Sequence, residues 1–127
     1  MRVDPVTVVY DYCQTLPEPI ASAVTGDLTS RSAGDTTIYL YHSGGFRLVR
    51  DRMDRADIEY EVYHQERYQA ASLAYLVREY LLESLPGLMV GDVQVLDVGE
   101  VRSPVYLPDD TSREHAYNGE VSVFFHD

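Results

Sequence analysis

Apolar and polar residues alternate most clearly over residues 56–64. Apolar side chains occupy the even-numbered positions 58, 60 and 62, whereas Asp57, Glu59 and Glu61 occupy the odd ones. Because successive side chains of a strand point to opposite faces of a sheet, this pattern predicts a strand with one buried face. A slip of one residue would bury three carboxylates, so the pairing register of this strand is strongly specified.

Similar patterns predict further strands separated by turns. Residues 36–42 place Ile38 and Leu40 on one face and Tyr39 and Tyr41 on the other. Ser43-Gly44-Gly45 then predicts a tight turn. More strands are predicted at residues 46–49, 93–101 and 115–125, with a short one at 20–25; the polar, Gly-rich or Pro-rich segments 26–35, 50–55 and 103–113 are predicted connections.

Two segments have the spacing of amphipathic helices. Over residues 65–85, apolar residues recur at 70, 73, 74, 77 and 81, and Pro86-Gly87 ends the pattern. Asp4-Pro5 is typical of a helix start, with an N-cap followed by proline at the first helical position. We therefore expect a long helix at about residues 65–85 and an N-terminal helix at about residues 4–15.

These elements predict an α+β fold. Short connections between strands favour a mostly antiparallel sheet of four to five strands, packed by the two helices as a two-layer sandwich. The length of 127 residues fits one domain spanning residues 1–127.

The charge of the chain restricts its partners. There are 21 acidic and 10 basic residues, for a net charge of -11, and every basic residue is arginine. So acidic a domain has too little positive charge to hold nucleic acid by neutralising phosphates. The exclusive use of arginine has two readings, which are the codon usage of a GC-rich genome and a demand for bidentate contacts at subunit interfaces.

The sequence contains no pattern typical of an enzyme. Ser43-Gly44-Gly45 lacks the lysine and the spacing of a phosphate-binding loop, the four histidines share no ligand spacing, and Cys13 lies in an apolar stretch. Asp109-Asp110 supplies too few oxygens for a calcium loop. We expect no catalytic residue, no metal site and no cofactor.

No targeting or membrane signal stands out either. The first residues lack the apolar region of a signal peptide, and no apolar run approaches the roughly 20 residues of a membrane span. We expect assembly in a cytoplasm without membrane contact.

Three groups of side chains are candidates for contact surfaces. Arg47, Arg50, Arg52 and Arg55 form a basic cluster, which is either a solvated hairpin or a contact with an acidic neighbouring copy. Tyr39, Tyr41 and Tyr63 lie on the face opposite the aliphatic residues, where they suit a protein interface unless a helix covers them. The acidic stripe at positions 57, 59 and 61 is either solvated or faces a subunit contact or a lumen.

Four stretches, taken in order, carry a resemblance. They are the arginine-rich segment running into the acidic-aromatic strand (50–63), the Ala/Leu helix (69–78), the proline-containing segment that ends in Leu-Pro-Asp (101–109) and the last strand (115–123). Over about residues 36–125 the chain resembles the small tail terminator, or tail-completion, proteins of siphophages.

The resemblance implies structural work at the head–tail junction of a virion. Such proteins are α+β subunits that form a hexameric ring on the last ring of tail tube protein, stop its growth and offer the other face to a head-completion (stopper) protein. Genomic DNA passes through without specific binding. The candidate interface residues are Arg47, Arg50, Arg52, Arg55, Tyr39, Tyr41, Tyr63, Tyr106 and Leu107. The candidate channel-lining acids, which would repel phosphate, are Glu59, Glu61, Asp109 and Asp110.

Two other readings stay open. A head–tail connector of the stopper or adaptor type is one, although connectors tend to be mostly β and the helix at 65–85 favours a terminator. A small acidic interaction module from outside any virus is the other.

Overall fold

The computed structural model describes residues 3–29, 31–49, 53–108 and 114–126, and its first helix follows the sequence prediction. Helix α1 spans Pro5–Cys13. The Asp4 side chain caps it by accepting a hydrogen bond of 3.0 Å from the Val6 backbone N–H. This satisfies one of the amide groups that a helix start leaves without a partner. The N-terminal helix predicted at about residues 4–15 is therefore confirmed.

The short strand predicted at residues 20–25 is wrong over its first four residues. Helix α2 (Ile20–Ala23) occupies them, and strand β1 is limited to Val24–Thr25. The Glu18 carboxylate accepts from the Ser22 N–H at 3.1 Å, and the Pro19 carbonyl accepts from the Ala23 N–H at 3.0 Å. These local bonds favour a helical turn over an extended chain.

The turn predicted at Ser43-Gly44-Gly45 is also wrong. Strand β2 runs without interruption from Thr37 to Val49 and pairs antiparallel with β3 (Met53–His64). A register shift between His42 and Gly44 marks a β-bulge. Gly45 has φ 127°, and a Cβ there would lie 2.8 Å from the Ala56 Cα and closer still to the Arg55 carbonyl oxygen. The two glycines therefore serve a bulge and a close strand approach.

The helix predicted at 65–85 is confirmed in place but is not one continuous α-helix. Helix α3 spans Arg67–Glu79 and continues as a π-helical turn, η1, over Tyr80–Ser84. The Tyr80 carbonyl accepts the Leu85 N–H at 3.1 Å, and the Tyr12 hydroxyl of α1 donates to the same oxygen at 3.1 Å. A side chain from another helix thus supports the wider turn.

The remaining strands complete a six-stranded sheet. They are β4 (Met89–Val90), β5 (Val93–Pro108) and β6 (His115–His126), and the strand order is β1-β2-β3-β6-β5-β4. The connection predicted at 103–113 is therefore wrong for residues 103–108, which extend β5. Pro104 is tolerated because β5 shifts register between Arg102 and Val105, where a backbone donor is not needed.

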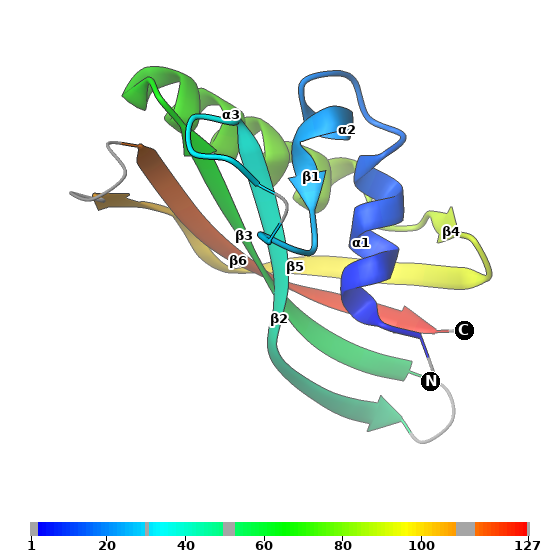
Figure 1. Ribbon diagram of the computed structural model, residues 1–127. Coiled ribbons are helices and arrows are strands. Elements are labelled where there is room, and N and C mark those ends of the chain that lie inside the picture. Colours follow the sequence, from blue (N-terminus) through cyan, green and yellow to red (C-terminus); the bar gives the residue numbers. More distant parts are fainter. Residues whose placement is uncertain (1–2, 30, 50–52, 109–113, 127) are drawn as a thin grey trace.

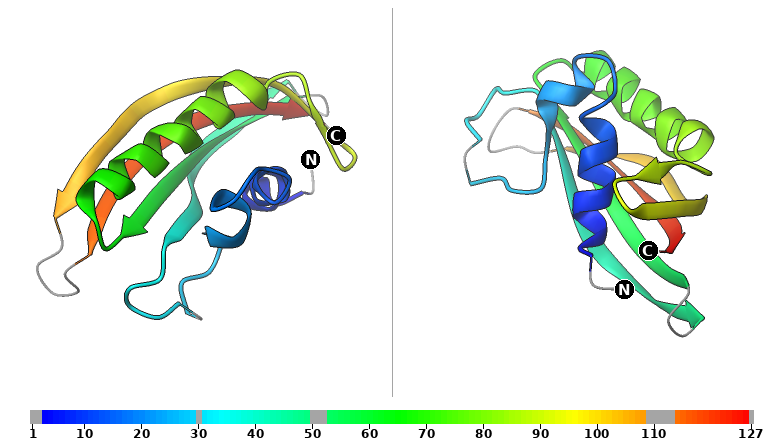
Figure 2. Two further views of the ribbon diagram at one scale, coloured as in Figure 1. Left: turned by 90° about the horizontal axis from the view of Figure 1, so that it is seen from above. Right: turned by 90° about the vertical axis from the view of Figure 1, so that its right-hand side faces the viewer.

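The helices lie on one face of a strongly curled sheet (Figure 1; Figure 2). All strand pairs are antiparallel except β1 with β2. The core fills the space between this face and the helices; its members include Ile38, Leu40, Ile58, Tyr60, Val62, Val77, Leu81, Val121 and Val123. The α+β class is confirmed. The sheet has six strands rather than four to five and dominates the fold, which differs from the predicted two-layer sandwich under one long helix.

Candidate functional site: the open face of the sheet

The face of the sheet opposite the helices is formed by strands β2, β3, β6 and β5. Directly paired residues of an antiparallel sheet share a face, so the pairing register defines rows across it. Five rows follow: Thr37–Tyr63–Ala116–Leu107, Tyr39–Glu61–Asn118–Val105, Tyr41–Glu59–Glu120–Arg102, Gly44–Asp57–Ser122–Gly99 and Phe46–Arg55–Phe124–Asp97. We call this surface the open face.

A hydrogen-bonded network occupies its centre. The Arg102 guanidinium donates to the Glu59 carboxylate at 3.2 Å, to the Asn118 backbone carbonyl at 2.9 Å and to the Asn118 side-chain oxygen. The Tyr41 hydroxyl donates to Glu59 at 3.1 Å and accepts from the Asn118 amide at 2.9 Å. Burial, together with the charges of Glu61 and Glu59, raises the pKa of Tyr41 to about 12. The tyrosine is therefore neutral at physiological pH.

A second cluster adjoins the network at Asp57. Burial alone would raise the pKa of this carboxyl, but hydrogen bonds from Arg55 (2.9 Å) and Ser122 (2.7 Å) outweigh it and hold the pKa below its usual range. The Ser43 hydroxyl links the Asp57 carbonyl (3.1 Å) to the Glu120 carboxylate (2.5 Å). Both clusters are thus built from side chains of several strands.

The open face is acidic and has aromatic residues along one side. The rows contain five carboxylates (Asp57, Glu59, Glu61, Asp97 and Glu120) and two guanidinium groups (Arg55 and Arg102), a net of three negative charges. The rings of Tyr39 and Tyr41 lie with centroids 5.0 Å apart, and the Tyr63 hydroxyl donates to Glu61 at 2.6 Å. Five of the residues predicted from the sequence therefore lie together on this face: Tyr39, Tyr41, Tyr63, Glu59 and Glu61. Helices α1 and α3 pack on the other face (Figure 2).

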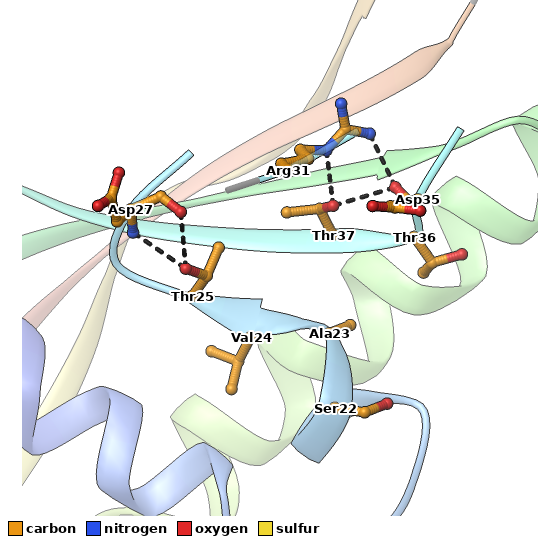
Figure 3. Close-up of a pocket in the computed structure, with 9 residues that line it drawn as sticks. All are labelled: Ser22, Ala23, Val24, Thr25, Asp27, Arg31, Asp35, Thr36 and Thr37. Carbon is orange, nitrogen blue, oxygen red and sulfur yellow. Dashed lines mark hydrogen bonds between the residues drawn. The ribbon is translucent and has the colours of Figure 1, made fainter. Parts of the chain in front are cut away.

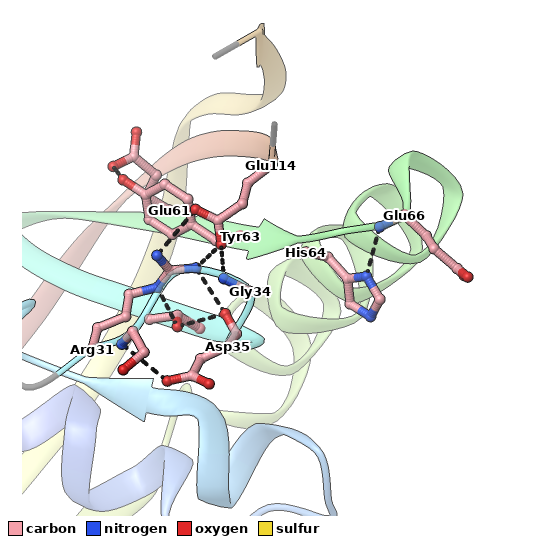
Figure 4. Close-up of polar contacts among 10 residues, drawn as sticks. Arg31, Gly34, Asp35, Glu61, Tyr63, His64, Glu66 and Glu114 are labelled. Atoms are coloured by element: carbon pink, nitrogen blue, oxygen red, sulfur yellow. Dashed lines mark hydrogen bonds and ion pairs between the residues drawn. The ribbon is translucent and has the colours of Figure 1, made fainter. Parts of the chain in front are cut away.

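A nearly buried ion pair ties a loop to this end of the sheet (Figure 4). The Arg31 guanidinium contacts both carboxylate oxygens of Glu114, with side chains 14% and 4% exposed. It also donates to the Thr37 hydroxyl (2.6 Å) and the Asp35 carbonyl (2.7 Å) and lies 4.7 Å from the Tyr63 ring centroid. The Gly34 N–H donates to Glu114 at 3.1 Å. We call this set of contacts the Arg31 latch; it fixes the loop before β2 to the start of β6.

The polar groups that line the hollow beside the latch are hydrogen-bonded among themselves (Figure 3). The hollow is open, encloses about 330 Å³ and is lined by short polar and small side chains from α2, β1 and the following loop. Its two carboxylates accept hydrogen bonds from the loop backbone: Asp27 accepts from the Thr29 N–H at 2.9 Å, and Asp35 accepts from the Ser32 N–H at 3.0 Å. The Arg31 guanidinium is held by the latch.

The other predicted site residues are dispersed. Arg47 forms an ion pair of 3.7 Å with Asp54, and Arg55 lies over the Phe46 ring as well as against Asp57. Tyr106 pairs with Tyr117 and contacts Arg67 of α3, so it lies on the helix side of the sheet. Leu107 is 41% exposed on the open face. Arg50, Arg52, Asp109 and Asp110 lie outside the described residues.

Sequence reasoning missed the partners that organise the open face. Arg102 falls one residue beyond the strand predicted at 93–101, so its role in the network was not visible. Asn118 and Ser122 share the even-numbered parity of β6 with Glu120, and this polar alternation was the available signal. The Arg31 latch joins residues 83 positions apart and has no local signal.

The described residues contain no cluster suited to metal or nucleophilic chemistry. No group of three or more His, Cys, Asp or Glu side chains among them could hold a metal ion. Burial raises the pKa of the Cys13 thiol to about 12, which keeps it protonated. His42 pairs with Ile58 and His64 with His115, so the two histidines do not meet across β2 and β3. No helix in this part of the chain is long and apolar enough to cross a membrane.

Comparisons with known proteins identify a shared fold. No family model and no curated protein matches the sequence. Among solved structures, a chain from "Virion of native gene transfer agent (GTA) particle" matches with a TM-score of 0.66 and 11% sequence identity. The match covers 100% of this chain and 89% of that chain. The protein therefore has the fold of a chain found in a gene transfer agent virion.

Proposed function

We propose that the protein is a structural subunit of a phage-like virion, and specifically a tail terminator. In this role, copies form a ring, six in number by the siphophage resemblance, on the end of the tail tube. The ring ends tube polymerisation and joins the tail to the head-completion protein. The chain does not act as an enzyme.

The observation that carries the proposal is the structural likeness to a gene transfer agent virion chain. It extends over the entire chain and most of its counterpart, so the two share their whole architecture and not one common motif. The sequence resemblance to tail terminators, which covers about residues 36–125, independently favours the same kind of particle and adds the position within it.

The open face suits the wall of a DNA channel. Its rows carry five carboxylates against two guanidinium groups, and a wall of like charge repels phosphate, so a genome passes without adhering. We place Glu59 and Glu61 on this wall. In a map of the assembled ring, these two side chains should face the lumen, and their placement on the outer rim would refute this part of the proposal.

Tube length provides the direct test of the terminator role. The tail tube protein from the same viral genome is polymerised with increasing amounts of this protein, and the length distribution is measured by electron microscopy. We expect tubes to shorten as the ratio of terminator to tube protein rises, because each capped end stops growing. Unchanged tube length, together with binding to the head portal instead, would favour a connector and contradict the terminator role.

A further inference from the structure

Exposed apolar side chains lie at two opposite edges of the sheet as well as on α3. In the described part of the chain, twelve large apolar side chains are exposed, and six of them lie within residues 88–107: Leu88, Met89, Leu96, Val101, Val105 and Leu107. We call strands β4 and β5 with these residues the β5 edge. On the opposite side, the far end of the β2–β3 hairpin exposes Phe46 (56%) and Leu48 (38%). We call residues 42–48 with 53–56 the arm.

The two sites differ in charge as well as in position. The arm carries Arg47 and Arg55 against one carboxylate, Asp54, which forms an ion pair of 3.7 Å with Arg47, so its net charge is positive. The β5 edge exposes Asp92 and Asp97. An apolar surface with a positive charge therefore faces outward at one edge of the sheet, and an apolar surface with negative charges at the other.

The pairing register of the sheet puts residues of both sites in the same rows across the strands. Phe46 shares a row with Asp97, through Arg55 and Phe124. On the helix side, Arg47 likewise shares a row with Val95, through Asp54 and Phe125. A second copy placed beside the first, with its strands parallel and no shift along them, therefore brings the arm of one against residues 95–97 of the other.

We infer that the arm of one copy docks on the β5 edge of the next copy, head to tail. This inference rests on the proposed ring and names its subunit contact. The contact joins unlike surfaces, so it leaves a free arm and a free edge that the following copies fill. A closed ring requires that each copy is related to the next by a rotation without a rise along the ring axis.

Side chains, and not added backbone pairing, make the contact. Strand β5 is interrupted by three register shifts and by Pro104, which disrupt the regular backbone groups that an added strand would need. Apolar contact supplies most of the binding energy, because exposed ion pairs contribute little. A hollow of about 300 Å³ at the base of the arm, lined in part by Val3, Phe46 and Phe125, offers space for an apolar side chain such as Leu96 of the neighbour.

Cysteine cross-linking tests this contact. The native Cys13 is buried, so it stays silent toward a short bismaleimide. The double variant Arg47→Cys/Asp97→Cys carries one reactive group on each proposed surface and keeps the apolar residues Phe46 and Leu96. The variant Tyr68→Cys/Tyr75→Cys carries two reactive groups on the exposed side of α3 and serves as the matched control. Far-ultraviolet circular dichroism verifies that both variants are folded. Each is cross-linked alone at high concentration and on tail tubes, and resolved on a denaturing gel.

The expected result is a ladder of covalent oligomers for the arm–edge variant and none for the control. Each single-cysteine variant should stop at dimers or give monomers, because a head-to-tail chain needs both groups. Rings seen by microscopy without a ladder would overturn the inference while leaving the terminator proposal intact. A ladder from protein that leaves tube length unchanged would support the contact and contradict the terminator role. The inference would also be overturned if the arm–edge variant stayed monomeric both in free solution and on tail tubes.

Discussion

Replacing Gly119 by alanine should destabilise the protein, because the residue lies under a buried tyrosine ring. Gly119 pairs directly with Tyr60 across β3 and β6, and Tyr60 is fully buried. A Cβ at position 119 would lie 2.9 Å from the Tyr60 Cε2 and closer still to Cζ and Oη. The ring is enclosed by the core and cannot swing away, so the strain is that of an overpacked interior, about 2 kcal/mol.

Urea denaturation followed by circular dichroism measures this loss, since the chain has no tryptophan. For a chain of this length, about 2 kcal/mol corresponds to a fall in Tm of roughly 6–10 °C. Gly99→Ala is the matched control on the neighbouring strand, because a Cβ there has no atom within 4 Å; its stability should change by less than about 0.5 kcal/mol. In a Tyr60→Leu background, Gly119→Ala should cost far less than in the wild type. Equal unfolding midpoints for Gly119→Ala and Gly99→Ala would refute the packing of Tyr60 over Gly119.

Four further outcomes are expected. Tyr60→Phe should leave the urea midpoint unchanged or raise it, because the buried Tyr60 hydroxyl has no hydrogen-bond partner in the described part of the chain; a loss above about 1 kcal/mol would contradict this. Arg31→Gln should lower the free energy of unfolding by about 3 kcal/mol in the same assay, because it removes the ion pair from a carboxylate that is 4% exposed, whereas Arg47→Gln on the exposed arm should change it little. Acid should lower the free energy of unfolding, because hydrogen bonds from Arg78 hold the pKa of Glu100 below its ordinary value. The stability that Glu100 contributes is present above the unfolded pKa of about 4.3 and is lost as the pH falls through the folded pKa. In a plot of unfolding free energy against pH, Glu100→Gln should flatten this acidic part. Alkali should also lower the free energy of unfolding, because the pKa of Tyr41 is raised to about 12 in the fold. The stability that Tyr41 contributes is complete below the unfolded pKa of about 10 and is lost as the pH rises toward 12. Ultraviolet titration of Tyr41→Phe should lack one late-ionising tyrosine.

Local patterns were enough to predict the elements whose causes are local. The alternation at residues 56–64 reflects a strand with one buried face, and β3 follows it. The helix start at Asp4-Pro5 depends only on contacts with neighbouring backbone groups, and α1 begins there. Because Tyr39, Tyr41, Glu59 and Glu61 share a parity with respect to the core residues, their common face could also be predicted.

Features that depend on distant residues could not be predicted in this way. Two adjacent glycines fit both a turn and a bulge, and the choice at Gly44-Gly45 depends on the close approach of Arg55 in the partner strand. The π-helical turn at Tyr80 depends on a hydroxyl 68 residues away. Strand β5 continues through Pro104 because a register shift there removes the need for a backbone donor, and a proline-containing segment read alone predicts a loop.

The Arg31 latch shows the same limit for the site. Arg31 lies in a polar loop, and nothing nearby in the sequence marks it as the partner of Glu114. The network around Arg102 and Asn118 depends on which strands are neighbours in the sheet. An acidic, aromatic face could therefore be predicted from alternation, whereas the contacts that hold it required the strand order β3-β6-β5.

Negative-stain microscopy of purified tail tubes incubated with the protein tests the terminator role most directly. The terminator role predicts tubes that carry one additional ring at a single end, with a central channel and a symmetry that can be counted in end views. Tubes that keep bare ends while the protein stays in solution would contradict it.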